Sequence, residues 1–404
     1  MNCLTRPVLT ILFMAVCATD AFAQSAPEFI ARRDIQFSGE IIAEAGDLVV
    51  TEPVTGDKVT LVLADGKRAA VQRSELADMN EAVAVLTSLI QREPKTARLY
   101  SARANVWAIK KDFPKAIADA TLAIEHTDPP DAVLFLNRGA FHTSTGDHTK
   151  AAADYVKATH IDPKFYPAYT SLAAAYIGRR EFDKAIELCT SVIKVDEKNP
   201  AHYVQRGVAY RQKKEWDAAI ADFSKALEFD RDNLAALGSR GFVSYLKGDH
   251  AAAVQDFDTI IKLTPNDAMA YNNRGYNHFL NKDCRSALKD FDRAIELLPT
   301  YATAYQNKAW MLATCADDEV RNGAAAVAAA QKAIEQRKSR VAADIKSLAA
   351  AYAETGDFAN AITYQTQVVD MMTPDNKAAE QQVLTQYKEK KPYRSQPVEV
   401  AKSN

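Results

Sequence analysis

Side chains that commonly carry out catalysis or bind metals are few in this chain, and their spacing matches no known site. The sequence contains seven histidines and five cysteines. His142, His148 and His160 lie close together, but their separations are not those of zinc ligands. No G-x-S-x-G, H-E-x-x-H or phosphate-binding glycine-rich motif is present. We therefore expect no enzyme activity, no bound metal and no cofactor.

Arginine and aspartate form a more regular pattern, in which an arginine is followed by an aspartate sixteen residues later. The five pairs are Arg103 with Asp119, Arg138 with Asp154, Arg206 with Asp222, Arg240 with Asp256, and Arg274 with Asp290. Where Leu172 replaces the arginine, Leu188 replaces the aspartate. Because charge is present at both positions or at neither, the pattern predicts structural ion pairs between helices. The alternative is a row of arginines that binds an anionic ligand.

The pairs recur because the chain contains a 34-residue repeat. Five segments align without gaps when they are started at Ala132, Tyr166, Pro200, Leu234 and Ala268. Position 8 is always glycine or alanine, position 20 is always alanine, and positions 4 and 24 carry mostly large side chains. Small residues let two antiparallel helices approach closely, and a proline at position 32 of three segments ends the second helix. Each segment is therefore predicted to be a helical hairpin.

The same frame extends in both directions and predicts one long array over residues 78–374. A half-repeat covers residues 78–95, and further repeats start near Ala97, Ala302 and Ala342, which gives eight complete repeats. Stacked repeats bury a continuous core and need a polar cap at the end. We expect residues 375–404 to supply that cap as a polar helix, followed by a disordered tail over 391–404.

This pattern resembles the tetratricopeptide repeat, which has small, aromatic and proline residues at these positions. The resemblance implies a mainly α fold, a right-handed solenoid of helix-turn-helix repeats, and a concave groove that binds protein or peptide partners. The segments at 310–317, 348–358 and 391–394 also resemble the closing repeats of a subgroup of bacterial repeat proteins.

In the tetratricopeptide family, positions 2, 5, 9 and 12 of the first helix usually line the groove. Seven residues at such positions are predicted to bind a partner: Phe242, Tyr245, Asn272, Tyr276, Phe279, Gln306 and Trp310. Aromatic side chains are the usual anchors of partner binding. The alternatives are that this aromatic patch packs against the chain's own tail or inside the superhelix. The family's carboxylate clamp is not implied, because Asn105 has Ser101 where that clamp has lysine.

Residues 1–23 have the composition of a secretory signal peptide, with Arg6, a short apolar run and the cleavage site Ala21-Phe22-Ala23. The sequence thus predicts cleavage before Gln24 and a periplasmic or secreted protein. Cys284 and Cys315 fall at the same end of neighbouring predicted helices, so we expect a disulfide between them in that oxidising compartment.

Residues 28–76 differ from the rest of the chain. Short β-branched runs at 59–63 and 67–71 flank Asp65-Gly66, which indicates a β-hairpin. The segment is predicted to be a small β meander, and it resembles a minimal bacterial SH3-like module.

The nearly balanced charge, net −2, argues against nucleic-acid binding, and no apolar run after the signal is long enough to span a membrane. The main prediction is a non-catalytic scaffold or adaptor that holds a protein or peptide, with no small-molecule substrate implied. The second is a structural subunit of the cell envelope whose β module contacts wall components. An enzyme is the third.

Overall fold

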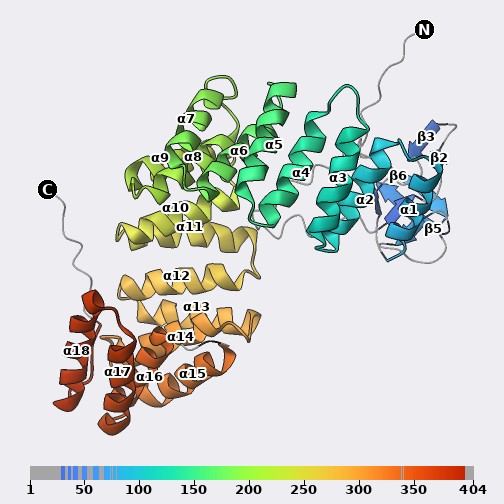
Figure 1. The fold of residues 1–404 in the computed structure, drawn as a ribbon. Helices are drawn as coiled ribbons and strands as arrows, with labels where there is room; N and C mark the ends of the chain where they lie inside the picture. Colours follow the sequence, from blue (N-terminus) through green and yellow to red (C-terminus); the bar gives the residue numbers. More distant parts are fainter. Residues whose placement is uncertain are drawn as a thin grey trace. The chain divides into compact units, whose positions relative to one another are not determined.

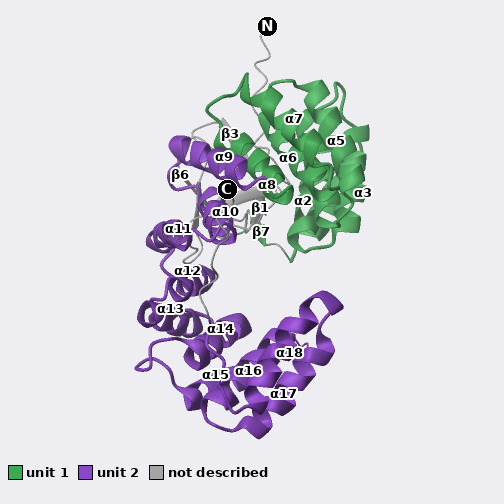
Figure 2. Ribbon diagram, turned by 90° about the vertical axis from the view of Figure 1, so that its left-hand side faces the viewer, with its two compact units in different colours: residues 1–214 green, residues 215–404 purple. Residues whose placement is uncertain are grey.

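The computed structural model describes residues 29–31, 35–37, 40–43, 48–51, 58–62, 68–72, 74, 76–78, 80–337, 339 and 341–395. These residues form seven short strands followed by eighteen helices (Figure 1). The chain divides into two compact units, Met1–Lys214 and Glu215–Asn404, called unit 1 and unit 2 below (Figure 2). The predicted signal peptide lies outside the described residues.

Unit 1 begins with the predicted β segment, and its strands are antiparallel. The seven strands are β1 Phe29–Ala31, β2 Ile35–Phe37, β3 Glu40–Ala43, β4 Leu48–Thr51, β5 Lys58–Val62, β6 Arg68–Gln72 and β7 Leu76–Asp78. Five of them form one sheet in the order β6-β5-β4-β1-β7, and β2 pairs with β3. The predicted turn at Asp65-Gly66 lies outside the described residues, but β5 and β6 on either side of it do pair, with Val59 opposite Val71. The last strand leads directly into the helices. Its Ala77 packs in one buried cluster with Leu86 of the first helix.

The rest of unit 1 is helical, and each of its helices packs against the next helix of the unit. The helices are α1 Ala82–Arg92, α2 Ala97–Ile109, α3 Phe113–Glu125, α4 Ala132–Ser144, α5 His148–Ile161, α6 Tyr166–Gly178, α7 Phe182–Ile193 and α8 Pro200–Gln212. Four of the predicted repeats begin at the first residues of α2, α4, α6 and α8. Aspartate side chains cap α3 and α5, where Asp112 and Asp147 accept hydrogen bonds from backbone N–H groups of the first turn.

Unit 2 continues with ten helices and no described strand. They are α9 Trp216–Phe229, α10 Leu234–Leu246, α11 His250–Leu263, α12 Ala268–Leu280, α13 Cys284–Leu297, α14 Ala302–Thr314, α15 Gly323–Gln336, α16 Ala342–Glu354, α17 Phe358–Met371 and α18 Pro374–Lys388. Residues 315–322 separate α14 from α15. The last helix, α18, packs on α17 and buries Val383, Leu384 and Tyr387. Among the eighteen described helices, none has the length and apolar character that crossing a membrane requires.

The turn between the two helices of a repeat uses left-handed backbone at position 15 in seven repeats. The residues there are Lys111, Gly146, Arg180, Lys214, Gly248, Lys282 and Gly356, with φ between 61° and 83°. Glycine adopts this conformation readily, whereas the four residues with side chains adopt it against a steric cost.

Four of the five predicted arginine–aspartate pairs have both residues in one unit, and each is a bidentate ion pair. They are Arg103–Asp119, Arg138–Asp154, Arg240–Asp256 and Arg274–Asp290, with N···O distances between 2.6 and 3.0 Å. The remaining nitrogen, Nη1, donates to a hydroxyl or carboxylate one helix earlier: Thr87, Thr121, Ser224 or Asp258. Each guanidinium thus joins its own repeat to the preceding one, which favours the structural interpretation over an anion-binding ladder. Arg206 and Asp222 belong to different units, so their pairing stays a prediction.

The small residues at position 8 are required to different degrees. A Cβ added to Gly139 would lie 2.5 Å from Cε1 of Tyr155, a ring that is fully buried. A Cβ added to Gly241 would lie 3.2 Å from the ring of Phe257, which a small shift relieves.

Replacing Gly139 with alanine is therefore expected to destabilise α4 and α5 by up to about 2 kcal/mol. Moving the ring of Tyr155 within a packed core costs about 1–3 kcal/mol, of which alanine regains about 1 kcal/mol in helix propensity. Gly241→Ala is the matched control. The methyl group added at position 241 needs only a small shift of its neighbours, and alanine gains about 1 kcal/mol of helix propensity over glycine. We therefore expect little net change in the free energy of unfolding. Urea unfolding followed by circular dichroism measures both. Equal midpoints for the two variants would contradict this account.

Candidate functional site

A pocket of about 230 Å³ lies within unit 2 and is lined by residues of α10, α11, α12 and α14. The nine lining residues define the aromatic pocket: Phe242, Tyr245, Phe257, Asn272, Asn273, Tyr276, Asn277, Thr303 and Asn307. Four of the seven predicted binding residues, Phe242, Tyr245, Asn272 and Tyr276, are among them. None of the nine side chains carries a formal charge at neutral pH.

One wall of the aromatic pocket is made of rings. Phe242 and Tyr245 have ring centroids 6.0 Å apart, and the ring of Tyr276 meets that of Tyr245 edge-on at 5.8 Å. Phe242 is 45% exposed, which is unusual for phenylalanine on a packed helix. Burial raises the pKa of Tyr276 to about 12, and the neighbouring hydroxyl of Tyr245 adds to this effect. Tyr276 is therefore a neutral phenol at physiological pH.

Another part of the pocket lining is a chain of asparagine amides. Asn307 Nδ2 donates to Asn272 Oδ1 at 2.9 Å, and Asn272 Nδ2 donates to Asn273 Oδ1 at 3.3 Å. Asn277 Nδ2 donates to the backbone oxygen of Asn273 at 2.9 Å, while its Oδ1 lies 3.1 Å from Nδ1 of His250. Within the described residues, the amide N–H groups of Asn273 and the amide oxygen of Asn307 make no hydrogen bond. The chain of amides thus keeps both a donor and an acceptor for a ligand.

Phe279 was predicted to line the groove, and the structure corrects this. Its side chain is only 7% exposed and packs in a core cluster with Cys284, Cys315 and Met311. Position 12 of this repeat faces the segment that follows α14, so the ring is covered there. Phe279 is a core residue and not an anchor.

Gln306 and Trp310 are also placed outside the aromatic pocket. Gln306 Nε2 donates to Ser347 Oγ at 3.1 Å. The ring of Trp310 lies 5.5 Å from the ring of Tyr393, and Lys346 Nζ lies 5.2 Å from its centroid. The prediction that residues 391–404 are disordered is wrong for 393–395, which pack on the last repeats. At Trp310 the chain therefore adopts the alternative in which the aromatic patch packs against its own tail.

The structure joins Cys284 and Cys315 in a disulfide. This bond links the first residue of α13 to the residue that follows α14, and both cysteines are buried. Its position next to Phe279 explains why that ring is enclosed.

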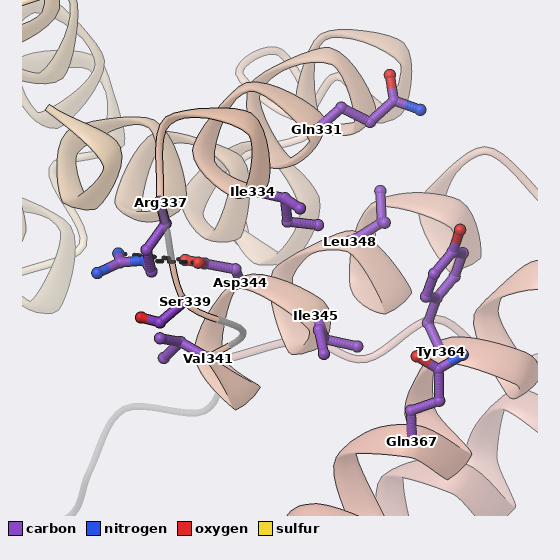
Figure 3. Close-up of a pocket in the computed structure, with 10 residues that line it drawn as sticks. All are labelled: Gln331, Ile334, Arg337, Ser339, Val341, Asp344, Ile345, Leu348, Tyr364 and Gln367. Atoms are coloured by element: carbon purple, nitrogen blue, oxygen red, sulfur yellow. Dashed lines mark hydrogen bonds and ion pairs between the residues drawn. The ribbon is translucent and has the colours of Figure 1, made fainter. Parts of the chain in front are cut away.

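Two further cavities of unit 2 are less suited to a ligand. One, of about 490 Å³, is lined by residues of α15, α16 and α17 and by the segment between α15 and α16 (Figure 3). Its polar rim is already engaged, because Arg337 Nε and Asp344 Oδ2 form an ion pair at 2.6 Å. The other, of about 660 Å³, is lined by both acidic and basic residues. Three of its basic residues, Arg285, Lys308 and Arg321, are also engaged in ion pairs.

Comparison with known proteins identifies the repeat. Residues 200–233 and 247–302 match family models of the tetratricopeptide repeat. The chain is 36% identical to heat shock protein STI1 of Saccharomyces cerevisiae over 90 residues, which are 22% of this chain and 15% of STI1. It is 31% identical to the Hsp70-Hsp90 organizing protein of Triticum aestivum over 115 residues, 28% of this chain and 20% of that one. The chain thus spans no more than a fifth of either relative.

Among solved structures, a tetratricopeptide repeat protein from Parabacteroides merdae is similar, with 17% identity and a TM-score of 0.47. The similarity covers 64% of this chain and 98% of that one. The family matches show that residues 200–233 and 247–302 carry tetratricopeptide repeats. The helices described above make both units mainly helical.

Five lining residues are not among the seven predicted ones: Phe257, Asn273, Asn277, Thr303 and Asn307. Thr303 is at position 2 of its repeat, which belongs to the set that faces the groove in the family, so the pattern could have identified it. Asn277 is at position 10 and Phe257 is on a second helix, and no rule on first-helix positions points to either.

Proposed function

We propose that this protein is a non-catalytic scaffold that binds an uncharged, extended segment of a protein partner in the aromatic pocket. The observation that carries the proposal is the exposed ring of Phe242 beside a chain of amides that has a donor and an acceptor unused. Helix packing does not require this combination, since other repeats have alanine at position 9, as at Ala140 and Ala174.

The rings and the amides of the pocket suit two parts of a peptide. Its apolar or aromatic side chain packs against Phe242, Tyr245 and Tyr276, since such rings bury a large area in fixed geometry. Its backbone accepts from Asn273 and donates to Asn307, because amide side chains match both groups of a peptide bond. The absence of charge in the lining disfavours a charged residue at this place.

The curated relatives are in line with a protein partner, because one is named as an organizing protein of Hsp70 and Hsp90. The matched segments are short, so that name supports the kind of partner and not its identity. We also infer export to an oxidising compartment from the signal-like residues 1–23, and the Cys284–Cys315 disulfide supports this.

The test is a selection of random decapeptides on the mature protein, followed by affinity measurements on the selected peptides. Phe242→Ala is expected to weaken binding about thirtyfold, which corresponds to about 2 kcal/mol and is typical of an interface hot spot. Tyr276→Ala is expected to have a similar effect, whereas Tyr276→Phe keeps the ring and most of the affinity. Fluorescence anisotropy of the labelled peptides gives the dissociation constants.

Leu263→Ala is the control, because this side chain is exposed at the end of α11 and does not line the pocket. Circular dichroism verifies that each variant remains helical. Selected peptides that bind all four variants equally would disprove the proposal.

A further inference from the structure

We propose that the surface beneath the tail is a second peptide-binding site, selective for an aromatic residue followed by arginine. The site, called the tail site here, consists of Trp310 and Thr314 of α14 and Glu354 of α16. Residues 393–395 of the chain are its resident ligand, and an equivalent segment of a partner protein can replace them. This inference does not rest on the proposed function of the aromatic pocket.

The aromatic residue is recognised by a ring. Tyr393 lies over Trp310 with centroids 5.5 Å apart and an interplanar angle of 38°. Tyr393 also contacts the buried cluster that contains Val383 and Tyr387 of α18. A ring therefore fills this space, and a small side chain would leave part of Trp310 uncovered.

The arginine is recognised by a mostly buried carboxylate. The Glu354 side chain is 14% exposed, and its Oε1 accepts from Nε of Arg321 at 3.0 Å. Its other oxygen, Oε2, forms an ion pair with Nη1 of Arg394 at 2.6 Å, and that oxygen makes no hydrogen bond in the described chain. When Arg394 leaves, a buried carboxylate oxygen is without a partner, which is unfavourable. The site thus selects a cation, and arginine is suited to carboxylates by its geometry.

The third contact is to the backbone and is independent of sequence. Thr314 is the last residue of α14, so its carbonyl oxygen has no partner within the helix. Both the backbone nitrogen and the hydroxyl of Ser395 donate to that oxygen at 3.2 Å. A partner residue of any type can supply the same backbone N–H group.

These contacts are confined to three consecutive residues, as in a short linear motif. Residues 388–391, which connect α18 to them, are exposed. Lys391 makes local contacts only, with Glu389 and the backbone oxygen of Gln386. Because the ligand is held by its own three residues, a separate peptide of the same sequence can make the same contacts.

The experiment uses the full chain with Tyr393→Ala and Arg394→Ala, which vacates the tail site and keeps α18. The probe is a fluorescein-labelled peptide with the sequence of residues 391–396, Lys-Pro-Tyr-Arg-Ser-Gln. We expect it to bind the vacated protein at least tenfold more tightly than the unmodified protein, where the tail competes. We expect the peptide to bind at least tenfold more weakly when alanine replaces its tyrosine or glutamine replaces its arginine.

Adding Glu354→Gln to the vacated protein is the matched test of selectivity. The arginine and glutamine peptides are then expected to bind equally well. A vacated protein that is folded and does not bind the peptide, or that binds all three peptides alike, overturns the inference.

If circular dichroism shows that the vacated protein is unfolded, a second variant avoids the problem. A protease site is inserted between Lys390 and Lys391, and the tail is cut only after folding. Exchange of the cut tail for the labelled peptide supports the inference, and a cut tail that excess peptide does not displace refutes it. Tyr276→Ala, which disables the aromatic pocket, is expected to leave this exchange unchanged, so failures of the two sites can be distinguished.

Discussion

Replacing Asp290 with alanine is expected to lower the free energy of unfolding of the α12–α13 hairpin by about 3 kcal/mol, because it removes one partner of a buried ion pair. The Asp290 side chain is 6% exposed, and it accepts two hydrogen bonds from Arg274, at 2.8 and 2.6 Å. The same contact raises the pKa of Arg274. After the substitution the guanidinium of Arg274 keeps its charge at a position that is largely shielded from water. Most of the expected loss of stability comes from this charge, which has lost its buried partner.

Asp258 provides the matched control, since it contacts Nη1 of the same arginine at 2.6 Å but is 40% exposed. Asp258→Ala is expected to cost less than about 1 kcal/mol, as is usual for exposed pairs. Native-state hydrogen exchange of the α12 and α13 amides resolves the local effect in an array that need not unfold as one unit. Equal effects of the two substitutions would show that burial does not determine the strength of these pairs.

Removal of the Cys284–Cys315 disulfide is the second change with a large expected effect. The bond closes a loop with a sequence separation of 31 residues. The loop-closure relation for such a length gives about 3.7 kcal/mol of stabilisation, from restriction of the unfolded chain. The variant with Cys284→Ala and Cys315→Ala is therefore expected to unfold α13 and α14 at a clearly lower temperature.

Reduction provides an independent control for the double variant. Dithiothreitol is expected to lower the unfolding temperature of the unmodified protein and to leave that of the double variant unchanged. Thiol titration under denaturing conditions, without reductant, should find one thiol in the mature oxidised protein. Three thiols, or an unmodified protein that is indifferent to reductant, would contradict the expectation.

The helical pattern could be predicted because it depends on residues that are close in sequence. Small residues at positions 8 and 20 define each hairpin locally, and seven of the eight hairpins also have a left-handed residue at position 15. The bidentate pairs follow the same logic, because the positions of Arg138 and Asp154 are fixed within one hairpin. The aromatic pocket was predictable in part for the same reason, since Phe242 and Tyr276 share position 9 of adjacent repeats.

The exposure of equivalent aromatic residues could not be predicted, because distant parts of the chain decide it. Tyr245 and Phe279 both occupy position 12, yet only Phe279 is enclosed by the segment that contains Cys315. Phe242 and Trp310 both occupy position 9, yet only Trp310 is covered by Tyr393. The tail itself has few apolar residues, and its order depends on contacts such as that of Ser395 with Thr314, 81 residues away. Composition within a short window contains no information on such contacts.

The left-handed turns have a consequence for the engineering of this array. At Lys111, Arg180, Lys214 and Lys282 the backbone adopts a conformation that glycine tolerates better, at a cost of about 1 kcal/mol for each residue with a side chain. These turns lie at the ends of hairpins and line none of the pockets described. Glycine at one to four of them would give a graded series of proteins that differ in rigidity and share the same ligand-contacting residues. Such a series would distinguish two contributions to the binding affinity of a solenoid. One is the stiffness of the array, and the other is the set of contacts that it makes with the ligand.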